Sequence, residues 1–294
     1  MGVLDNIAIG IHMLWSRLKV RAPFIRALKS LEKTQADVLM RILRDNNKTE
    51  FGKKYGLSEI SSVGEFRNQV PIHDYDDLEP YIKRQQEGHR SLTTEAPVYY
   101  ARTSGTTGSY KDIPLTDSGI TQIKHFQKQL AYSLWSQTDF FRGTILGFSS
   151  PRFEGKLSNG IPYGSTSGAI YDSLSSLFKK KLAIPSEAFD LNDVESKYEV
   201  YALSALAHDS VTGVSSVNPS SLLKVCTLIE ENAEALISLL LGNDQSNKND
   251  KFDSIVLLLR SRMSSERVEL LSHCLKSGEN LSPKMLWPRL STLV

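Results

Sequence analysis

The sequence has few cysteines and almost no excess of charge of either sign. Its two cysteines, Cys226 and Cys274, both fall in patterns typical of helices, so a disulfide framework is not expected and a reducing compartment is indicated. Among 294 residues, 35 Lys and Arg stand against 33 Asp and Glu, a net charge of +2. This balance argues against an obligatory polyanionic partner. We therefore predict a cytoplasmic protein with no nucleic-acid partner.

A long uninterrupted hydrophobic run is also missing. The most apolar stretch, residues 222–241, carries one lysine and three glutamates, which argues against a transmembrane segment and favours a helix with one buried face. Residues 7–15 are apolar, but Asp5 precedes them and their basic neighbours follow, which is the reverse of a secretory signal. Asn6 also stands where an N-myristoylation signal has Ser or Thr. Neither export nor lipidation is expected.

No cluster of nucleophilic or metal-ligating side chains stands out. The six histidines are scattered, and His73 and His89 are too far apart to form a metal pair on one helix. We expect the histidines at surface or capping positions, predict no protein metal site and assign no catalytic residue. The chain also lacks the G-x-x-x-x-G-K-[ST] loop and the G-x-G-x-x-G turn, which excludes two common kinds of nucleotide site.

Residues 1–30 are predicted to form a basic amphipathic helical segment. Residues 1–60 hold 11 Lys and Arg against 6 Asp and Glu, which a solvated helix face explains better than a nucleic-acid footprint. The helix is expected to end or kink at Pro23. Its apolar side chains are expected to pack onto the body of the protein. Attachment to a membrane surface is the alternative, which the modest charge density disfavours. These side chains are Leu14, Trp15, Leu18, Phe24, Ile25 and Leu28.

Strand and helix patterns alternate along the rest of the chain. Strands are predicted at residues 98–100 and 144–148, and the alternation after Pro288 predicts another. Residues 51–70 are loop-like, residues 242–251 form a polar linker, and residues 149–169 are either a functional loop or a flexible excursion. This alternation indicates the α/β class. Helices are predicted at 31–47, 74–88, 116–135, 186–209 and 219–241, with two more before Pro283.

The most informative segment follows the first predicted strand. It reads T-S-G-T-T-G-S-Y-K, with two glycines, five hydroxyl side chains before the tyrosine and one lysine. Glycines let backbone N–H groups turn inward, hydroxyls donate hydrogen bonds, and a lysine supplies positive charge, so the loop can hold phosphates. Its composition alone also fits an ordinary turn. The predicted phosphate-binding residues are Thr103, Ser104, Gly105, Thr106, Thr107, Gly108 and Lys111.

The order of residues in this loop resembles the phosphate loop of the adenylate-forming superfamily. Tyr110 stands where the usual loop has a proline, a position that the acyl acid amido synthetases relax. Other segments also look like that branch, the auxin-responsive promoter family of acyl acid amido synthetases. The resemblance runs from about residue 30 to the last residue. The segments are residues 47–52, 55–57, 70–72, 75–82, 111–116, 160–165, 218–220 and 286–288.

The resemblance implies a fold and an activity. It implies the large N-terminal domain of an adenylate-forming enzyme, with mixed sheets and packed helices, in which residues 31–294 are an incomplete adenylation domain. Family members use Mg-ATP to convert a carboxylic acid to an acyl adenylate, and then transfer the acyl group to an amine such as an amino acid. The loop would hold the ATP phosphates, with Lys111 as a secondary contributor.

The family's chains continue beyond this point with two further adenylate motifs and a small C-terminal domain. We therefore expect this chain to be an N-terminal portion of such a ligase, with its own activity an open question. An acyl-CoA ligase and an inactive remnant are the alternatives. The acid, the amine and the oligomeric state are not predicted.

Overall fold

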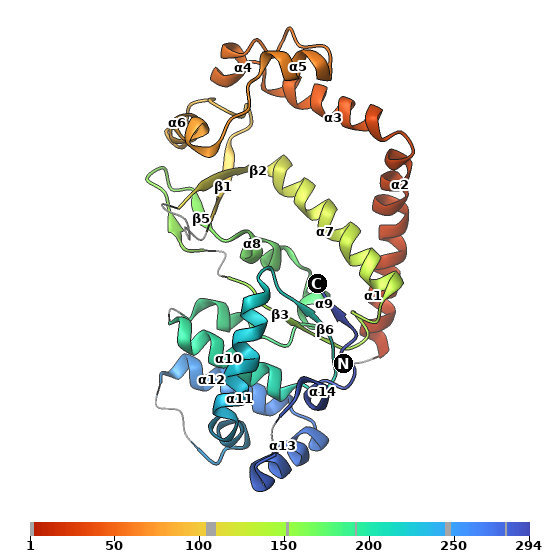
Figure 1. Cartoon of the computed structure of the whole chain (residues 1–294), viewed down its shortest axis with the longest axis vertical. Helices are drawn as coiled ribbons and strands as arrows, with labels where there is room; N and C mark the ends of the chain where they lie inside the picture. The colour runs from red at the N-terminus through yellow and green to blue at the C-terminus, as the bar shows by residue number, and fades with distance from the viewer. Residues whose placement is uncertain (1–2, 104–109, 151–152, 192, 245–247, 280) are drawn as a thin grey trace. The chain divides into compact units, whose positions relative to one another are not determined.

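The computed structural model describes residues 3–103, 110–150, 153–191, 193–244, 248–279 and 281–294 (Figure 1). The chain divides into two compact units, and each draws on separate stretches of sequence. Unit 1 comprises Met1–His12, Ser133–Pro151 and Ser173–Val294, and unit 2 comprises Met13–Tyr132 and Arg152–Asp172. No helix among the described residues is long and apolar enough to cross a membrane.

The N-terminal helix does not end at Pro23. Helix α1 (Val3–Ser16) runs into a π-helical stretch, η1 (Arg17–Arg21), and then into α2 (Ala22–Leu28). Proline lacks an N–H group and crowds the preceding turn, and a wider π turn directly before it relieves both problems. The chain therefore stays helical through the predicted break.

Residues 51–70 contain two short helices joined by turns, so the prediction of a loop is wrong for the helical parts. Helix α3 (Leu31–Asn46) agrees with its prediction and is followed by α4 (Glu50–Lys54) and α5 (Val63–Gln69). Side chains cap both short helices: Thr49 accepts a hydrogen bond from the Gly52 N–H, and Ser62 accepts one from the Glu65 N–H. Apolar residues of all three helices pack in one cluster, which stabilises helices too short to form alone. The buried members are Leu43, Leu57 and Ile60.

Unit 2 contains a four-stranded sheet in the order β2-β1-β5-β4. The predicted strand at 98–100 is the centre of β1 (Pro97–Arg102), which pairs antiparallel with β2 (Asp112–Thr116) and parallel with β5 (Pro162–Gly164). β5 also pairs antiparallel with β4 (Gly155–Lys156). β2 was not predicted because Pro114 interrupts its pattern, and its edge position tolerates a proline. The segment 149–169 therefore holds two short strands.

Three more helices flank this sheet in sequence. Helix α6 (Tyr75–Gln86) begins at a capping box in which Asp74 and Asp77 each accept a hydrogen bond from the other's backbone N–H, as the sequence predicts for its start. Helix α7 (Asp117–Gln137) follows β2 directly and confirms the helix predicted at 116–135. Helix α8 (Thr166–Ser173) follows β5.

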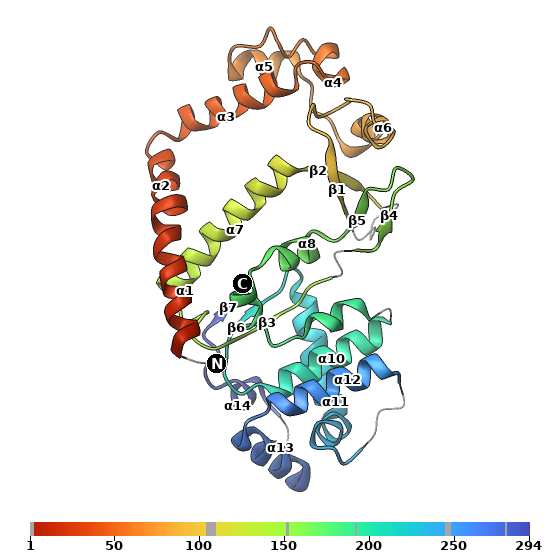
Figure 2. The same ribbon diagram turned by 180° about the vertical axis from the view of Figure 1, so that it is seen from behind.

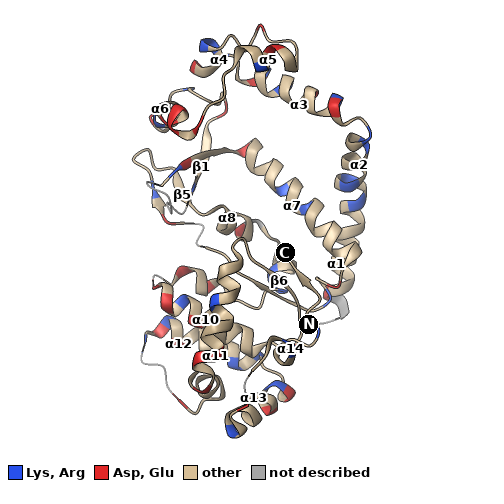
Figure 3. Ribbon diagram, in the orientation of Figure 1, with Lys and Arg blue, Asp and Glu red and all other residues tan. Residues whose placement is uncertain are grey.

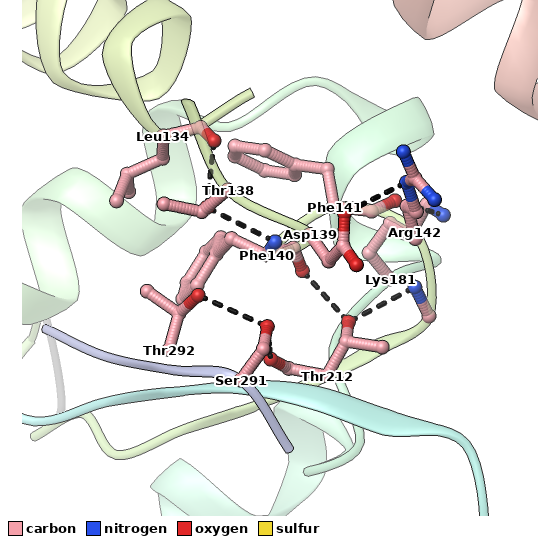
Figure 4. A network of polar contacts seen from close by, with 11 residues as sticks. Leu134, Thr138, Asp139, Phe140, Phe141, Arg142, Lys181, Thr212, Ser291 and Thr292 are labelled. Carbon is pink, nitrogen blue, oxygen red and sulfur yellow. Dashed lines mark hydrogen bonds and ion pairs between the residues drawn. The ribbon is translucent and has the colours of Figure 1, made fainter. Parts of the chain in front are cut away.

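Unit 1 contains a parallel sheet in the order β3-β6-β7. β3 (Thr144–Gly147) matches its prediction, β6 (Val211–Ser215) was not predicted, and β7 (Thr292–Leu293) confirms the strand predicted after Pro288. Figure 4 shows polar contacts that tie these segments together. The Thr212 hydroxyl donates to the Phe140 carbonyl over 2.9 Å, and the Ser291 hydroxyl donates to the Thr212 carbonyl over 3.2 Å.

The second half of helix α10 (Val194–Ala207) is buried in unit 1. All residues from Val200 to Ala207 are buried, and α10 contacts both α11 (Pro219–Leu241) and α12 (Asp250–Arg262) (Figure 2). A helix buried on every side loses apolar periodicity, so the sequence predicted it only as part of 186–209. Residues Ser186–Asp190 form a separate 3-10 helix. The remaining helices are α9 (Ser176–Lys179), α13 (Ser265–Ser277) and α14 (Pro283–Leu286).

The predicted start of α11 is confirmed. The Asn218 side chain accepts a hydrogen bond from the Ser220 N–H over 3.1 Å, and Pro219 occupies the first helical position. α11 ends at Gly242, whose φ of 84° is the left-handed conformation that glycine favours. The segment predicted as a polar linker therefore begins where predicted, and Asn249 caps α12 at its other end.

Candidate functional site

The loop predicted to bind phosphates is the turn of the β1–β2 hairpin. Ser104, Gly105, Thr106, Thr107 and Gly108 lie outside the described residues, whereas Thr103 and Lys111 lie within them. The Thr103 N–H donates to the Lys111 carbonyl over 3.0 Å, and the Lys111 N–H donates to the Thr103 hydroxyl over 3.2 Å. These two predicted residues face each other across the base of the loop.

An ion pair closes the hairpin one position before this base. Arg102 and Asp112 are paired in the sheet register, and their side chains form two hydrogen bonds: Nε to Oδ1 at 2.8 Å and Nη2 to Oδ2 at 2.9 Å. Both side chains are mostly buried, with exposed fractions of 19% and 16%. The hydrogen bonds to Asp112 raise the pKa of Arg102 further above its usual value. A two-pronged pair of this kind fixes orientation as well as distance.

Two tyrosine rings lie within cation–π distance of the Arg102 guanidinium. The guanidinium carbon of Arg102 lies 3.5 Å from the ring centroid of Tyr163 in β5 and 5.7 Å from that of Tyr110. Stacking of this sort suits a planar, weakly hydrated cation. Because β5 is the parallel neighbour of β1, Tyr163 reaches Arg102 from another strand of the same sheet.

Tyr75, the first residue of α6, contacts both residues at the start of β2. Its hydroxyl accepts a hydrogen bond from the Asp112 N–H over 3.0 Å, and burial raises the pKa of this hydroxyl. The Nζ atom of Lys111 lies 5.0 Å from the centroid of the Tyr75 ring, a cation–π distance. The Lys111 side chain thus lies beside the Tyr75 ring at the base of the hairpin.

Tyr100 adds a buried donor on the same face as Arg102, since alternate residues of a strand share a face. Its side chain is fully buried, and within the described residues its hydroxyl has no hydrogen-bond partner. Burial raises the pKa of Tyr100 to about 12, so it stays protonated and able to donate.

Two of the six histidines have contacts that explain them structurally. His73 lies 2.8 Å from the Tyr55 hydroxyl and 2.6 Å from the Pro71 carbonyl, and His208 caps the end of α10. In the part of the chain that the structure describes, no group of three or more His, Cys, Asp or Glu side chains could hold a metal ion.

Sequence reasoning identified the loop and missed the residues that support it. Arg102, Asp112, Tyr75 and Tyr163 meet from three separate segments, which no local pattern reveals. The only sequence signal was that Tyr75, Asp112 and Tyr163 fall within segments that carry the family resemblance.

Comparison with known protein families identifies the family of the chain that carries this hairpin. The profile described as "GH3 family N-terminal domain" matches residues 21–294. The chain belongs to the GH3 family. This confirms the resemblance to the acyl acid amido synthetases.

Curated GH3 relatives include the jasmonoyl-L-amino acid synthetase JAR6 of Nicotiana attenuata, which is 29% identical over 231 residues, covering 74% of this chain and 39% of that protein. The indole-3-acetic acid-amido synthetase GH3.3 of Arabidopsis thaliana is 27% identical over 236 residues, covering 72% of this chain and 38% of that protein. The chain thus spans about two fifths of the length of these relatives.

Solved GH3 structures share the fold. The GH3.15 acyl acid amido synthetase gives a TM-score of 0.72 at 23% identity, over 87% of this chain and 47% of that one. A structure described as AtGH3.15 acyl acid amido synthetase in complex with 2,4-DB gives a TM-score of 0.73 at 23% identity. That match covers 89% of this chain and 47% of the other. The predicted mixed α/β fold is therefore confirmed, as that of a GH3 N-terminal domain.

Proposed function

We propose that the β1–β2 hairpin of this GH3 chain binds the phosphates of ATP, as part of an acyl acid amido synthetase. The observation that supports this most is the braced hairpin: Arg102 and Asp112 close its base, and the Lys111 side chain lies against the Tyr75 ring next to this pair. A loop that binds a polyphosphate stabilises it better when the base of the loop is already fixed before the negatively charged phosphates bind. Residues 31–294 would then be an adenylation region, in a cytoplasmic protein.

The proposed reaction has two steps. A carboxylate oxygen of the acid attacks the α-phosphorus of ATP, the bond to the β-phosphate oxygen breaks, and pyrophosphate leaves. An amine, such as that of an amino acid, then attacks the acyl carbon and releases AMP. Negative charge builds on the departing pyrophosphate in the first step, so backbone N–H groups, hydroxyls and Lys111 around the β and γ phosphates would lower its barrier. The relatives' names point to carboxylic acids and amino acids as the substrate classes.

The residues at the hairpin fit a nucleotide that binds as its magnesium complex. The donors here are a lysine, hydroxyls and backbone N–H groups, which bind phosphate oxygens, and the described residues hold no carboxylate cluster for a metal. Mg²⁺ commonly takes substrate phosphates, water and one or two carboxylates as ligands. When bound, it would neutralise charge on the leaving pyrophosphate.

Binding of ATP, ADP and AMP to the 294-residue chain tests the site. We expect ATP to bind most tightly and AMP most weakly, because the loop would contact the β and γ phosphates. Thr107→Ala and Lys111→Ala should weaken ATP binding about tenfold or more, the loss expected for one charge-assisted contact. Lys83→Ala, which removes an exposed lysine of α6, is the matched control. Equal affinity for AMP and ATP, or unchanged ATP binding by both loop variants, would exclude the loop as the site.

The chemical class is tested on the protein isolated from its source cells at its native mass. Pyrophosphate exchange that depends on a carboxylic acid would support adenylate formation. The same reaction, supplied with an amino acid or with CoA, then distinguishes an amide from a thioester product. Formation of the thioester alone would favour the acyl-CoA ligase. Absence of exchange with every acid offered would favour an inactive remnant.

A further inference from the structure

The N-terminal helices expose the apolar side chains that were expected to pack onto the body of the protein. Leu14 is 54% exposed, Leu18 68% and Phe24 44%, so that expectation is wrong for this face. Ile7 and Ile11 extend the same set toward the N-terminus, with exposed fractions of 53% and 64%. Ile7, Ile11, Leu14 and Leu18 are three or four residues apart and therefore form one stripe along the helix. We call these four residues the apolar stripe.

Helix α1 packs against the rest of the protein through the face opposite the apolar stripe. Ile9 and Met13 are 2% and 1% exposed, and Ser16 is also buried. At 100° per residue, these three positions lie on the side of the helix opposite Ile7, Ile11 and Leu14. The helix therefore has a buried face of its own, and the stripe is a second apolar face that α1 does not need for packing.

Positive charge accompanies the stripe. Between Asp5 and Glu32 the sequence contains five Lys and Arg and no acidic residue, and Figure 3 shows this run of basic residues along η1 and α2. Among the described residues, none of the five takes part in an ion pair of 4.0 Å or less. A sixth cation, Lys128, lies with its Nζ atom 5.6 Å from the ring centroid of Trp15, which is 49% exposed. The five are Arg17, Lys19, Arg21, Arg26 and Lys29.

We propose that this helical segment binds to an anionic lipid surface, with the apolar stripe inserted at the headgroup boundary and the cations against the headgroups. An exposed apolar face with a tryptophan beside it and uncompensated cations around it are the features of a helix that lies in a membrane interface. The charge decides between this surface and a second copy of the chain. Two copies that met through the stripe would bring two sets of five unpaired cations together, whereas anionic lipids neutralise them.

Flotation with phospholipid vesicles tests the proposal on the full 294-residue chain. We expect the chain to float with vesicles of phosphatidylcholine and about 30% phosphatidylserine and to stay unbound with phosphatidylcholine alone. Leu18→Asp should abolish binding, because it places a charge in the stripe. Lys19→Gln with Arg21→Gln should weaken binding about fivefold for each charge removed. Leu223→Asp is the matched control, since Leu223 is 67% exposed but lies in α11.

Each other outcome contradicts the proposal. Equal binding to both vesicle types, or equal loss with Leu18→Asp and Leu223→Asp, would show that the cations or the stripe are not responsible. Failure to float with either vesicle would exclude the membrane. A concentration-dependent dimer that Leu18→Asp dissociates, without vesicle binding, would assign the stripe to a second copy. None of these results depends on ATP binding, so the proposed function is tested separately.

Discussion

Arg102 and Asp112 form two parallel hydrogen bonds of 2.8 and 2.9 Å across the last register pair of a hairpin whose loop was predicted to hold phosphates. The pair lies where the two strands separate, so it limits how far the loop's ends can move apart. Tyr163 stacks on the guanidinium and Tyr75 binds the Asp112 backbone, which fixes the pair from two sides. The hairpin base is therefore determined by long-range contacts.

Removal of this pair should weaken nucleotide binding without direct loss of a phosphate contact. Arg102→Ala leaves a mostly buried carboxylate unpaired, which should lower the free energy of unfolding by about 2 to 4 kcal/mol and ATP affinity about tenfold. Arg142→Ala is the control, because its pair with Asp139 is exposed and should contribute less than about 1 kcal/mol. Urea unfolding and ATP titration check both values. Unchanged ATP affinity in folded Arg102→Ala would contradict the positioning role.

Two adjacent lysines should differ sharply in their effect on stability. Lys181, which Figure 4 shows near Phe141, is 1% exposed. Its Nζ atom donates to the Phe141 carbonyl over 2.6 Å and to Asn6 Oδ1 over 3.0 Å. Lys181→Ala should lower the free energy of unfolding by about 2 kcal/mol or more, because it leaves the Phe141 carbonyl unpaired and removes a packed stem. Lys180→Ala removes only the contact of an exposed lysine with Asp5, so the free energy of unfolding should change by less than about 0.5 kcal/mol. Equal changes in urea midpoint would show that burial is not the cause.

Stability should fall in mild acid because of His208. Burial lowers the pKa of its imidazole, and the nearby Arg262 and Arg267 lower it further, while Asp209 and the Ser204 carbonyl act in the opposite direction. The unfolded chain therefore binds a proton near pH 6.5 that the folded chain does not yet bind, so stability is full above about pH 6.5 and is lost below it. His208→Gln should reduce the fall in Tm between pH 7.5 and 5.5. An identical fall in the variant, measured by calorimetry, would assign the effect to other groups.

Alanine at two glycines should have opposite effects. A Cβ on Gly143 would overlap the Ser210 carbonyl oxygen, which accepts the Thr144 N–H at the start of the β3–β6 pairing, so Gly143→Ala should lower the free energy of unfolding by more than about 2 kcal/mol. A Cβ on Gly10 in α1 would meet nothing within 4 Å, and Gly10→Ala should raise stability by up to about 1 kcal/mol. Thermal unfolding of both variants checks the contrast. A stable Gly143→Ala would show that β3 and β6 can separate without cost.

Local signals predicted elements well and pairings poorly. The Asp74 capping box and the Asn218–Pro219 start depend on residues within three positions of each other, and both helices begin as predicted. β6 was missed because its pairing with β3 joins residues more than 60 positions apart. The short helices of residues 51–70 were missed because their glycines suggested a loop, whereas Gly52 is required by close approach of the Asn47 backbone, 2.8 Å from where its Cβ would be.

The candidate site shows the same division. Thr103 and Lys111 were identified from a local motif and do face each other. The residues that support them were not identified. Arg102 binds Asp112 on the next strand and stacks on Tyr163, which lies on a strand about 60 residues later in the sequence. The exposed stripe of α1 and η1 was also unpredictable, because an apolar periodicity does not say which of two apolar faces the protein buries.

Because the two units draw on interleaved stretches of sequence, the ribosome completes unit 2 well before unit 1. Unit 2 has all of its residues once Asp172 has left the ribosome, whereas unit 1 includes residues 3–12 but gains the third strand of its sheet only with Thr292 and Leu293. Nascent β3 and its buried Ile145 and Leu146 must therefore wait for partners made much later. Domains with such late, long-range closure fold slowly and expose strand edges meanwhile. We therefore expect unit 1 to fold after unit 2 and to leave strand edges unpaired for longer during translation.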